Sequence, residues 1–250
     1  MSALTGVALF LAACSSVDDG RHDAMGEYPW HTEIIATTFW VGEVLDPLVS
    51  DGSQVVSTYD ANWMENYGGC DGVVEDGVCK TERRTADNDY FPTSMEPKQN
   101  PFYLDLPFDD VNNRWAFAMR ADVVPWADDL GYAGREKDRS FSYLKNRWVR
   151  LERDDAVCYG QIQDAGPAIY DDAEYVFGRN DARPKSDQFN GAGMDVSPAL
   201  NGCLGFSELN GQRDKINWQF VDDDEVPEGP WKIIVTTTPV VPFGSVPGPR

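Results

Sequence analysis

Seven short runs rich in β-branched and aromatic residues limit what this chain of 250 residues can fold into. The runs cover residues 33–41, 54–59, 102–106, 147–151, 157–163, 216–221 and 231–237. Strong turn signals separate them, such as Asp164-Ala165-Gly166-Pro167. No internal repeat and no sustained helical periodicity is present, so we expect helix only in short pieces, for example at 171–177 and 197–204. Many short strands with few helices indicate a mainly β barrel or sandwich.

The N-terminus indicates export. Residues 4–13 form an apolar run that ends Leu11-Ala12-Ala13-Cys14. About ten apolar residues are too few to span a bilayer, but they suit the core of a signal peptide. The ending matches the bacterial lipobox, in which Cys14 is lipidated; the alternative is a plain secretory signal with an incidental cysteine. We expect a signal peptide at 1–13 and a protein held by its lipid alone to the periplasmic or extracellular face of the bacterial envelope.

Four cysteines remain beyond the signal segment, namely Cys70, Cys79, Cys158 and Cys203. In an exported chain they indicate two disulfides, for which three pairings are possible. Local spacing favours Cys70–Cys79 as a small loop, which leaves Cys158–Cys203 to join distant segments. A zinc site is the alternative, but the chain has no Cys-x-x-Cys and only two histidines.

Composition sets the organisation and the partners. We expect a polar tether at 14–30, one domain at 31–238 with an insertion near 108–144, and a loose Pro- and Gly-rich tail at 239–250. The formal net charge of −21 argues against nucleic acid and anionic membrane surfaces as partners. An uncharged polysaccharide would not be repelled, and we expect a monomer that binds one.

The sequence supports few types of catalytic site. Two histidines make a Ser-His-Asp or Cys-His arrangement improbable, and no GxxxxGK[ST] or strand-associated GxGxxG motif supports nucleotide binding. The acidic run 222–225 lacks calcium-loop spacing and is interpreted as a solvated loop. We therefore predict carboxylate chemistry without a cofactor or a metal.

Three aspartates stand apart by their settings. Asp60 directly follows the run 54–59. Asp164 directly follows the run 157–163 and enters a tight turn, and Asp195 follows a small-residue loop. After Asp195, Ser197 is a predicted helix N-cap with Pro198 at the first helical position. These aspartates are candidate catalytic residues. The alternative is that each carboxylate only accepts backbone N–H bonds in a turn.

The order of these pieces resembles the double-psi β-barrel superfamily, which includes rare lipoprotein A, the expansins, barwin and glycoside hydrolase family 45. The motifs that carry the resemblance are the run 144–151, the run 158–163, Asp164-Ala165-Gly166-Pro167 and Gly193-Met194-Asp195-Val196-Ser197-Pro198-Ala199. Residues 102–107 are similar to the second strand with its Leu-Pro ending, Ser57-Thr58-Tyr59-Asp60 to the first strand, and 216–221 and 231–237 to the closing strands.

The resemblance covers about residues 53–237 as scattered motifs, and it departs from the families in three places. The histidine of rare lipoprotein A is absent, and Tyr103 or Asp105 stands near its place. The family 45 His-Phe-Asp-Leu becomes Gly193-Met194-Asp195-Val196, and the double cysteine after the first-strand aspartate is missing. The implied fold is a six-stranded double-psi β-barrel with long loop insertions and short helices.

The implied activity is cleavage of a β-linked glycan, either peptidoglycan or β-glucan. By this resemblance Asp195 is the general acid, Asp60 the base that activates water, and Asp164 the neighbour that sets the pKa of Asp195. Five aromatic residues are candidates to stack on sugar rings or, alternatively, to pack in the core: Tyr59, Trp63, Tyr67, Tyr103 and Trp218.

Three functions are therefore open. The first is a glycoside hydrolase or lytic transglycosylase, which requires a second carboxylate facing Asp195 across a groove. The second is an expansin-like glycan-binding module with exposed aromatic rings and no effective base. The third is an envelope scaffold whose aspartates only satisfy turns.

Overall fold

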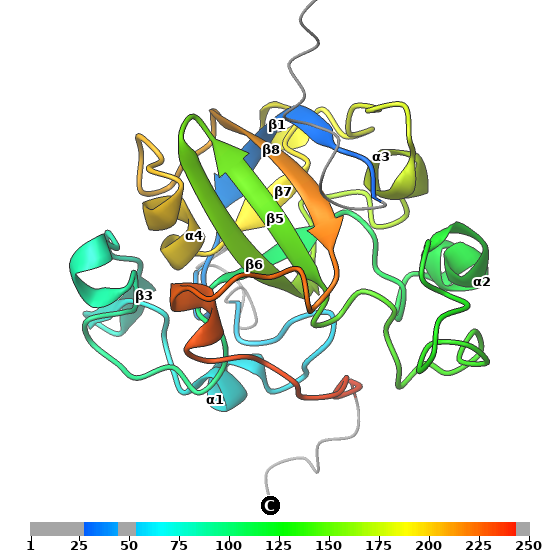
Figure 1. Cartoon of the computed structure of the whole chain (residues 1–250). Coiled ribbons are helices and arrows are strands. Elements are labelled where there is room, and N and C mark those ends of the chain that lie inside the picture. The colour runs from blue at the N-terminus through cyan, green and yellow to red at the C-terminus, as the bar shows by residue number, and fades with distance from the viewer. Residues whose placement is uncertain (1–27, 45–53, 244–250) are drawn as a thin grey trace, which may run out of the picture.

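The computed structural model describes residues 28–44 and 54–243, in which six strands close into one barrel. The strands are β1 (His31–Thr38), β4 (Tyr103–Leu106), β5 (Trp148–Arg153), β6 (Ala156–Ala165), β7 (Met194–Val196) and β8 (Asp214–Val221). Around the barrel they follow the order β1-β7-β4-β6-β5-β8 (Figure 1). The prediction of a mainly β, six-stranded barrel is confirmed.

Two of the strand pairs are parallel, β1 with β7 and β4 with β6, and the other four are antiparallel. Parallel neighbours require long connections, and these carry the chain outside the barrel. The connection from β1 to β4 holds a separate hairpin of β2 (Val73–Glu75) and β3 (Val78–Lys80). The connection from β4 to β5 holds the expected insertion, which projects to one side in Figure 1.

Helices are short, as predicted. The α-helices are α1 (Trp63–Tyr67), α2 (Arg114–Val123), α3 (Ala173–Phe177) and α4 (Pro198–Cys203), and the 3₁₀ turns are η1 (Ala86–Asn88), η2 (Gln188–Asn190) and η3 (Pro230–Lys232). The predicted start of α4 is confirmed, because the Ser197 hydroxyl accepts the backbone N–H of Leu200 at 3.2 Å. None of the described helices is long and apolar enough to span a bilayer.

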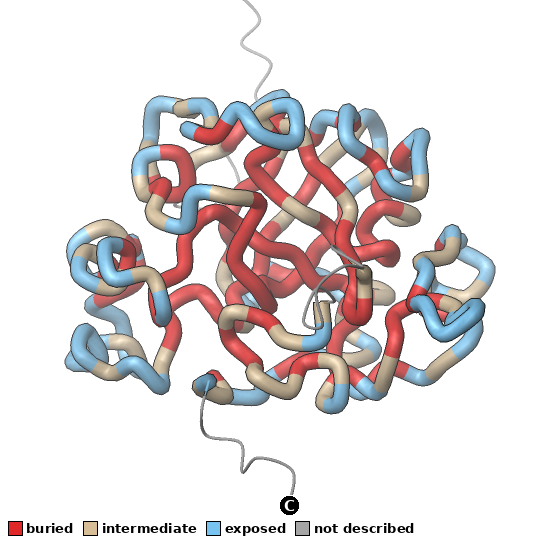
Figure 2. Tube along the Cα trace, turned by 180° about the vertical axis from the view of Figure 1, so that it is seen from behind, coloured by how far each residue is buried: buried red, intermediate tan, exposed pale blue. Residues whose placement is uncertain are grey.

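The core fills the barrel and the space beneath α4, which Figure 2 shows as buried backbone through the centre of the molecule. Residues 158–165 of β6 are buried on both strand faces. At Gly160 an added Cβ would lie 2.8 Å from the Cδ1 of Leu200, so the missing side chain lets α4 pack directly on β6.

Both expected disulfides are present. Cys70–Cys79 holds the β3 strand to the end of α1, and Cys158–Cys203 joins β6 to α4. The second bridge therefore joins β6, which contains the candidate site residue Asp164, to α4, which begins shortly after the candidate site residue Asp195.

Three predictions about the chain's organisation are wrong in part. Residues 54–59 form no strand and make only isolated bridges, and 231–237 begins with η3 because Pro230 starts a helical turn. The described part of the tail is attached rather than loose, since Val241 exchanges backbone hydrogen bonds with Tyr59 and Ala61. The signal segment, Cys14 and most of the tether lie outside the described residues.

Candidate active site

Three aspartates lie side by side on neighbouring strands. Asp105 of β4 is in register with Asp164 of β6 on one side and with Asp195 of β7 on the other. Thr37 of β1 continues the row, because it is in register with Asp195. Residues in register across a sheet project from the same face. The barrel therefore places the three carboxyl groups in a line across β6, β4 and β7.

Two local features make room for this line. The β4–β6 ladder changes register between Leu104 and Asp105, which brings Asp164 rather than Gln163 opposite Asp105. Such bulges re-aim side chains and are frequent beside active sites. At Gly166, an added Cβ would lie 2.6 Å from the Oδ2 of Asp105, so glycine is needed where the turn passes this carboxyl.

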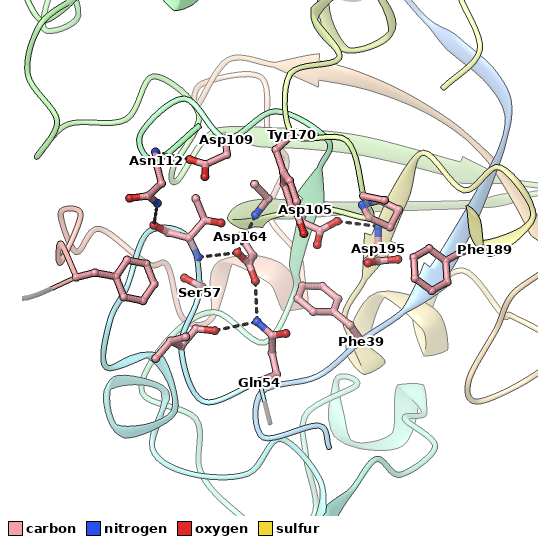
Figure 3. A pocket seen from close by; sticks show the side chains of 17 residues that line it. Phe39, Gln54, Ser57, Asp105, Asp109, Asn112, Asp164, Tyr170, Phe189 and Asp195 are labelled. Atoms are coloured by element: carbon pink, nitrogen blue, oxygen red, sulfur yellow. Dashed lines mark hydrogen bonds between the residues drawn. The ribbon is translucent and has the colours of Figure 1, made fainter. Parts of the chain in front are cut away.

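The row forms the floor of an open cleft with a volume of about 540 Å³ (Figure 3). The cleft is lined by all three aspartates, by the turn 165–168, by Gln54 and residues 56–58, and by Phe39, Asp109, Asn112, Tyr170, Phe189 and Phe243. These residues include no lysine or arginine. The cleft is therefore suited to a neutral or cationic ligand and not to an anionic one.

Asp164 is held by donors around its carboxylate. Its Oδ1 accepts the backbone N–H groups of Thr58 at 2.7 Å and Ala165 at 2.8 Å, and its Oδ2 accepts the amide of Gln54 at 2.8 Å. Burial raises the pKa of Asp164 to about 6, against the lowering effect of the Thr58 and Ala165 N–H groups. The Thr58 side chain also lowers this pKa by hydrogen bonding, so the carboxylate is surrounded by donors.

Asp195 is half-buried and holds its proton more tightly. Burial raises its pKa to about 8, and the negative charges of Glu43 and Asp164 add to the rise. The Thr37 hydroxyl donates to its Oδ1. At neutral pH Asp195 is thus mainly protonated while Asp164 is mainly ionised.

Asp105 also favours its protonated form. Burial and the charges of Asp195 and Asp164 raise its pKa well above the usual range. Its Oδ1 accepts the backbone N–H of Asp195 at 2.9 Å. A neutral Asp105 between the two outer aspartates keeps like charges from meeting directly.

The structure does not bring Asp60 into the cleft. Asp60 is 1% exposed, and its carboxylate accepts the backbone N–H of Asn62 and the side-chain amide of Asn66, each at 2.9 Å. These bonds are those of an aspartate that fixes a turn, which was the alternative interpretation. The prediction that Asp60 and Asp195 face one groove is therefore wrong, and Asp164 is an aspartate that does line the cleft with Asp195.

The prediction that five aromatic residues stack on sugar rings is also wrong. Each is at most 1% exposed, so none can present a ring face to a ligand: Tyr59, Trp63, Tyr67, Tyr103 and Trp218. Two of them form hydrogen bonds to other buried side chains instead. The Tyr103 hydroxyl donates to the Oδ2 of Asp71 at 2.7 Å, and the indole N–H of Trp218 donates to the Tyr175 hydroxyl at 2.9 Å.

Other aromatic rings surround the cleft and were missed in the sequence. Tyr170, Phe189 and Phe243 line it and are 45%, 53% and 54% exposed. Phe189 has a φ of 51°, which a bulky residue rarely adopts, and Ala168 and Ile169 before Tyr170 also have positive φ. Strained backbone thus displays two of these rings, and strain of this kind is typical of ligand-binding segments.

The fold and the site together define a closed β-barrel protein with an open cleft. Aspartates form the floor of this cleft, and exposed aromatic rings line its rim. No protein-family model, no curated protein and no solved structure matches the chain. The cleft's own chemistry is therefore the basis for assigning a function.

Proposed function

We propose that this chain is an exported, lipid-anchored glycosidase or lytic transglycosylase that cleaves a β-linked polysaccharide in the aspartate-floored cleft. The observation that carries the proposal is the division of protonation between two carboxyls in one cleft. A pKa of about 8 for Asp195 and about 6 for Asp164 gives one acid and one base near neutral pH.

In this mechanism Asp195 donates its proton to the glycosidic oxygen as the bond to the anomeric carbon breaks. Asp164 takes a proton from a water molecule, whose oxygen then bonds to the anomeric carbon from the opposite face of the sugar. A lytic reaction would replace the water with a hydroxyl of the same sugar. Asp105 positions Asp195 through its hydrogen bond to the Asp195 N–H.

The spacing of the strands supports an inverting reaction. Neighbouring strands lie roughly 4.8 Å apart, so residues two strands apart, such as Asp164 and Asp195, have backbones roughly 10 Å apart. Inverting glycosidases hold their two carboxyl groups about 6.5–9.5 Å apart, which leaves room for the water. Adjacent carboxyls would lie closer, as in retaining enzymes.

The surroundings support a polysaccharide as the substrate. Exposed rings at the rim, Tyr170, Phe189 and Phe243, offer faces on which pyranose rings can stack, and the lining has no cation to favour an acidic polymer. Membership of the double-psi class is supported by the two parallel strand pairs, by Asp164 near the end of β6 and by Asp195 in the short strand β7.

One observation favours the expansin-like alternative. Three hydrogen-bond donors on the Asp164 carboxylate weaken it as a base, whereas the exposed rings would bind a glycan without cleavage. In that case the chain would bind polysaccharide and release no product.

The two functions are separated by incubating the full chain with peptidoglycan and with soluble β-glucans, and measuring soluble products and new reducing ends. We expect the parent to release products and Asp195→Asn to release none. Asp187→Asn, an exposed carboxyl outside the cleft lining, is the matched control and should act as the parent does. Equal release by the parent and Asp195→Asn would overturn the proposal, and binding without release by all three proteins would favour the alternative.

A further inference from the structure

A second cavity, of about 380 Å³, shares no lining residue with the aspartate cleft. The insertion, the segment just before β5, the segment after β8 and the C-terminal segment all contribute to its lining. Its charged lining residues are Lys145, Arg147 and Asp223. In a chain with a formal net charge of −21, a cavity with two cations and one carboxylate is a local reversal of sign.

Lys145 is the unusual member. Its side chain is 7% exposed, yet its ammonium makes no ion pair with any residue that the structure describes. Within the same residues its one hydrogen bond goes to a neutral acceptor, the Oε1 of Gln163, at 2.8 Å. Burial lowers the pKa of Lys145 to about 8, while the negative charges of Asp60 and Asp164 favour its charged form without forming an ion pair with it. An ammonium has three donors, so Lys145 keeps donors for a further partner.

Arg147 adds a second positive charge to the lining. Its Nη2 binds the carboxylate of Asp222 at 2.7 Å, and its guanidinium lies over the ring of Trp126 at 4.2 Å. Its Nε is buried without a hydrogen-bond partner among the described residues. The stacking and the ion pair hold this group in place, so its positive charge at the cavity is fixed before any ligand arrives.

We propose that this cavity binds a small oxyanion, a carboxylate or a phosphate group, through the Lys145 ammonium, beside the positive charge of the Arg147 guanidinium. The anion accepts the remaining Lys145 donors through charge-assisted hydrogen bonds. The cavity is far larger than one water molecule, so the oxyanion can belong to a larger ligand whose remainder contacts Tyr132, Phe141 and Val240.

The test is a titration of the full chain with inorganic phosphate and, separately, with acetate, at pH 7 and constant ionic strength, followed by calorimetry. We expect saturable binding of at least one anion with a Kd below about 10 mM, and an affinity loss of at least about tenfold in Lys145→Met. Lys137→Met removes an exposed lysine of the same insertion and should bind as the parent does. Phosphate binding alone would indicate a phosphate-bearing ligand, and acetate binding a carboxylate.

Two outcomes would overturn the proposal: no saturation by either anion, or equal affinity in Lys145→Met and the parent. If Lys145→Met does not fold, Lys145→Gln removes the charge and keeps a donor for Gln163. Asp195→Asn, changed in the other cleft, should bind the anion with unchanged affinity. The anion site and the proposed glycan cleavage can therefore fail separately.

Discussion

The backbone N–H of Asp195 donates a 2.9 Å hydrogen bond to the carboxyl oxygen Oδ1 of Asp105 on the neighbouring strand. This bond fixes the strand end that carries Asp195, while the Asp105 carboxyl occupies the space that Gly166 leaves open. The three aspartates of the cleft are thus set by strand register, a bulge and one glycine rather than by flexible loops.

Replacing Asp195 should make the protein more stable while removing its activity. The raised pKa means that the folded state retains a proton that the unfolded chain has released. This contribution to stability is complete below about pH 4 and is lost as the pH rises through about 8. Asparagine mimics the neutral form at every pH, so Asp195→Asn should gain about 0.5–2 kcal/mol in the free energy of unfolding at pH 8. Urea unfolding measures this, and a destabilised variant would contradict it.

The rate of glycan cleavage should depend on pH as a bell-shaped curve. Asp164 must be ionised and Asp195 protonated, so the rate should fall below about pH 6 and above about pH 8. The two groups influence each other, so the two limbs belong to the pair rather than to single residues. In Asp164→Asn the acid limb should disappear along with most of the activity. A rate that keeps rising above pH 9 would exclude Asp195 as the proton donor.

Phe189 and Phe243 should contribute to substrate binding. Each exposes more than half of its ring surface at the cleft, and loss of one stacking ring costs about 0.5–1.5 kcal/mol. We expect Phe189→Ala and Phe243→Ala each to lower kcat/KM by roughly 2- to 12-fold, mainly through KM. Trp115→Ala removes a ring that is 55% exposed on α2, outside the cleft lining, and should leave kcat/KM unchanged. Equal effects in all three variants would remove the role given to the rim.

His31 should make the fold sensitive to acid. Its imidazole is fully buried, stacks on Trp218 with ring centroids 3.9 Å apart, and has no hydrogen-bond partner for either nitrogen among the described residues. Burial lowers its pKa to about 4, so between pH 6.5 and 4 the unfolded chain binds more protons than the folded one. The stability it contributes is full above about pH 7 and falls as the pH drops towards 4.

The comparison variant for this residue is His31→Phe, which keeps the stacked ring and cannot be protonated. Relative to the parent, it should gain roughly 3 kcal/mol in unfolding free energy as the pH falls from 7 to 4. Denaturant unfolding at both pH values measures the difference. A constant difference would show that His31 does not titrate with unfolding.

Much of the barrel could be predicted from its sequence, because local turn signals mark where its strands begin and end. The runs at 147–151 and 157–163 became β5 and β6, and Ser197 and Pro198 start α4 as their residue types require. Residues 54–59 have the same β-type composition but find no ladder partner, and long-range pairing is not encoded in local composition.

The site was predicted in part for the same reason. Asp164 and Asp195 stand next to turn and helix-start signals, whereas Asp105 lies within the buried strand β4, where an acidic residue between Leu104 and Leu106 was the available signal. Asp60 has a similar local setting to Asp164, and only the tertiary structure shows that Asn66 occupies its carboxylate. The rim rings of Phe189 and Phe243 come from segments without regular strand or helix patterns, so nothing in the sequence marked them.

We expect the cleft to hold Asp164 ionised and Asp195 protonated near neutral pH. An NMR pH titration of the aspartate carboxyl carbons tests this directly, with Asp164→Asn and Asp195→Asn used to assign the signals. We predict a midpoint near 6 for Asp164 and near 8 for Asp195. Midpoints for both residues near the ordinary value of about 4 would contradict the account.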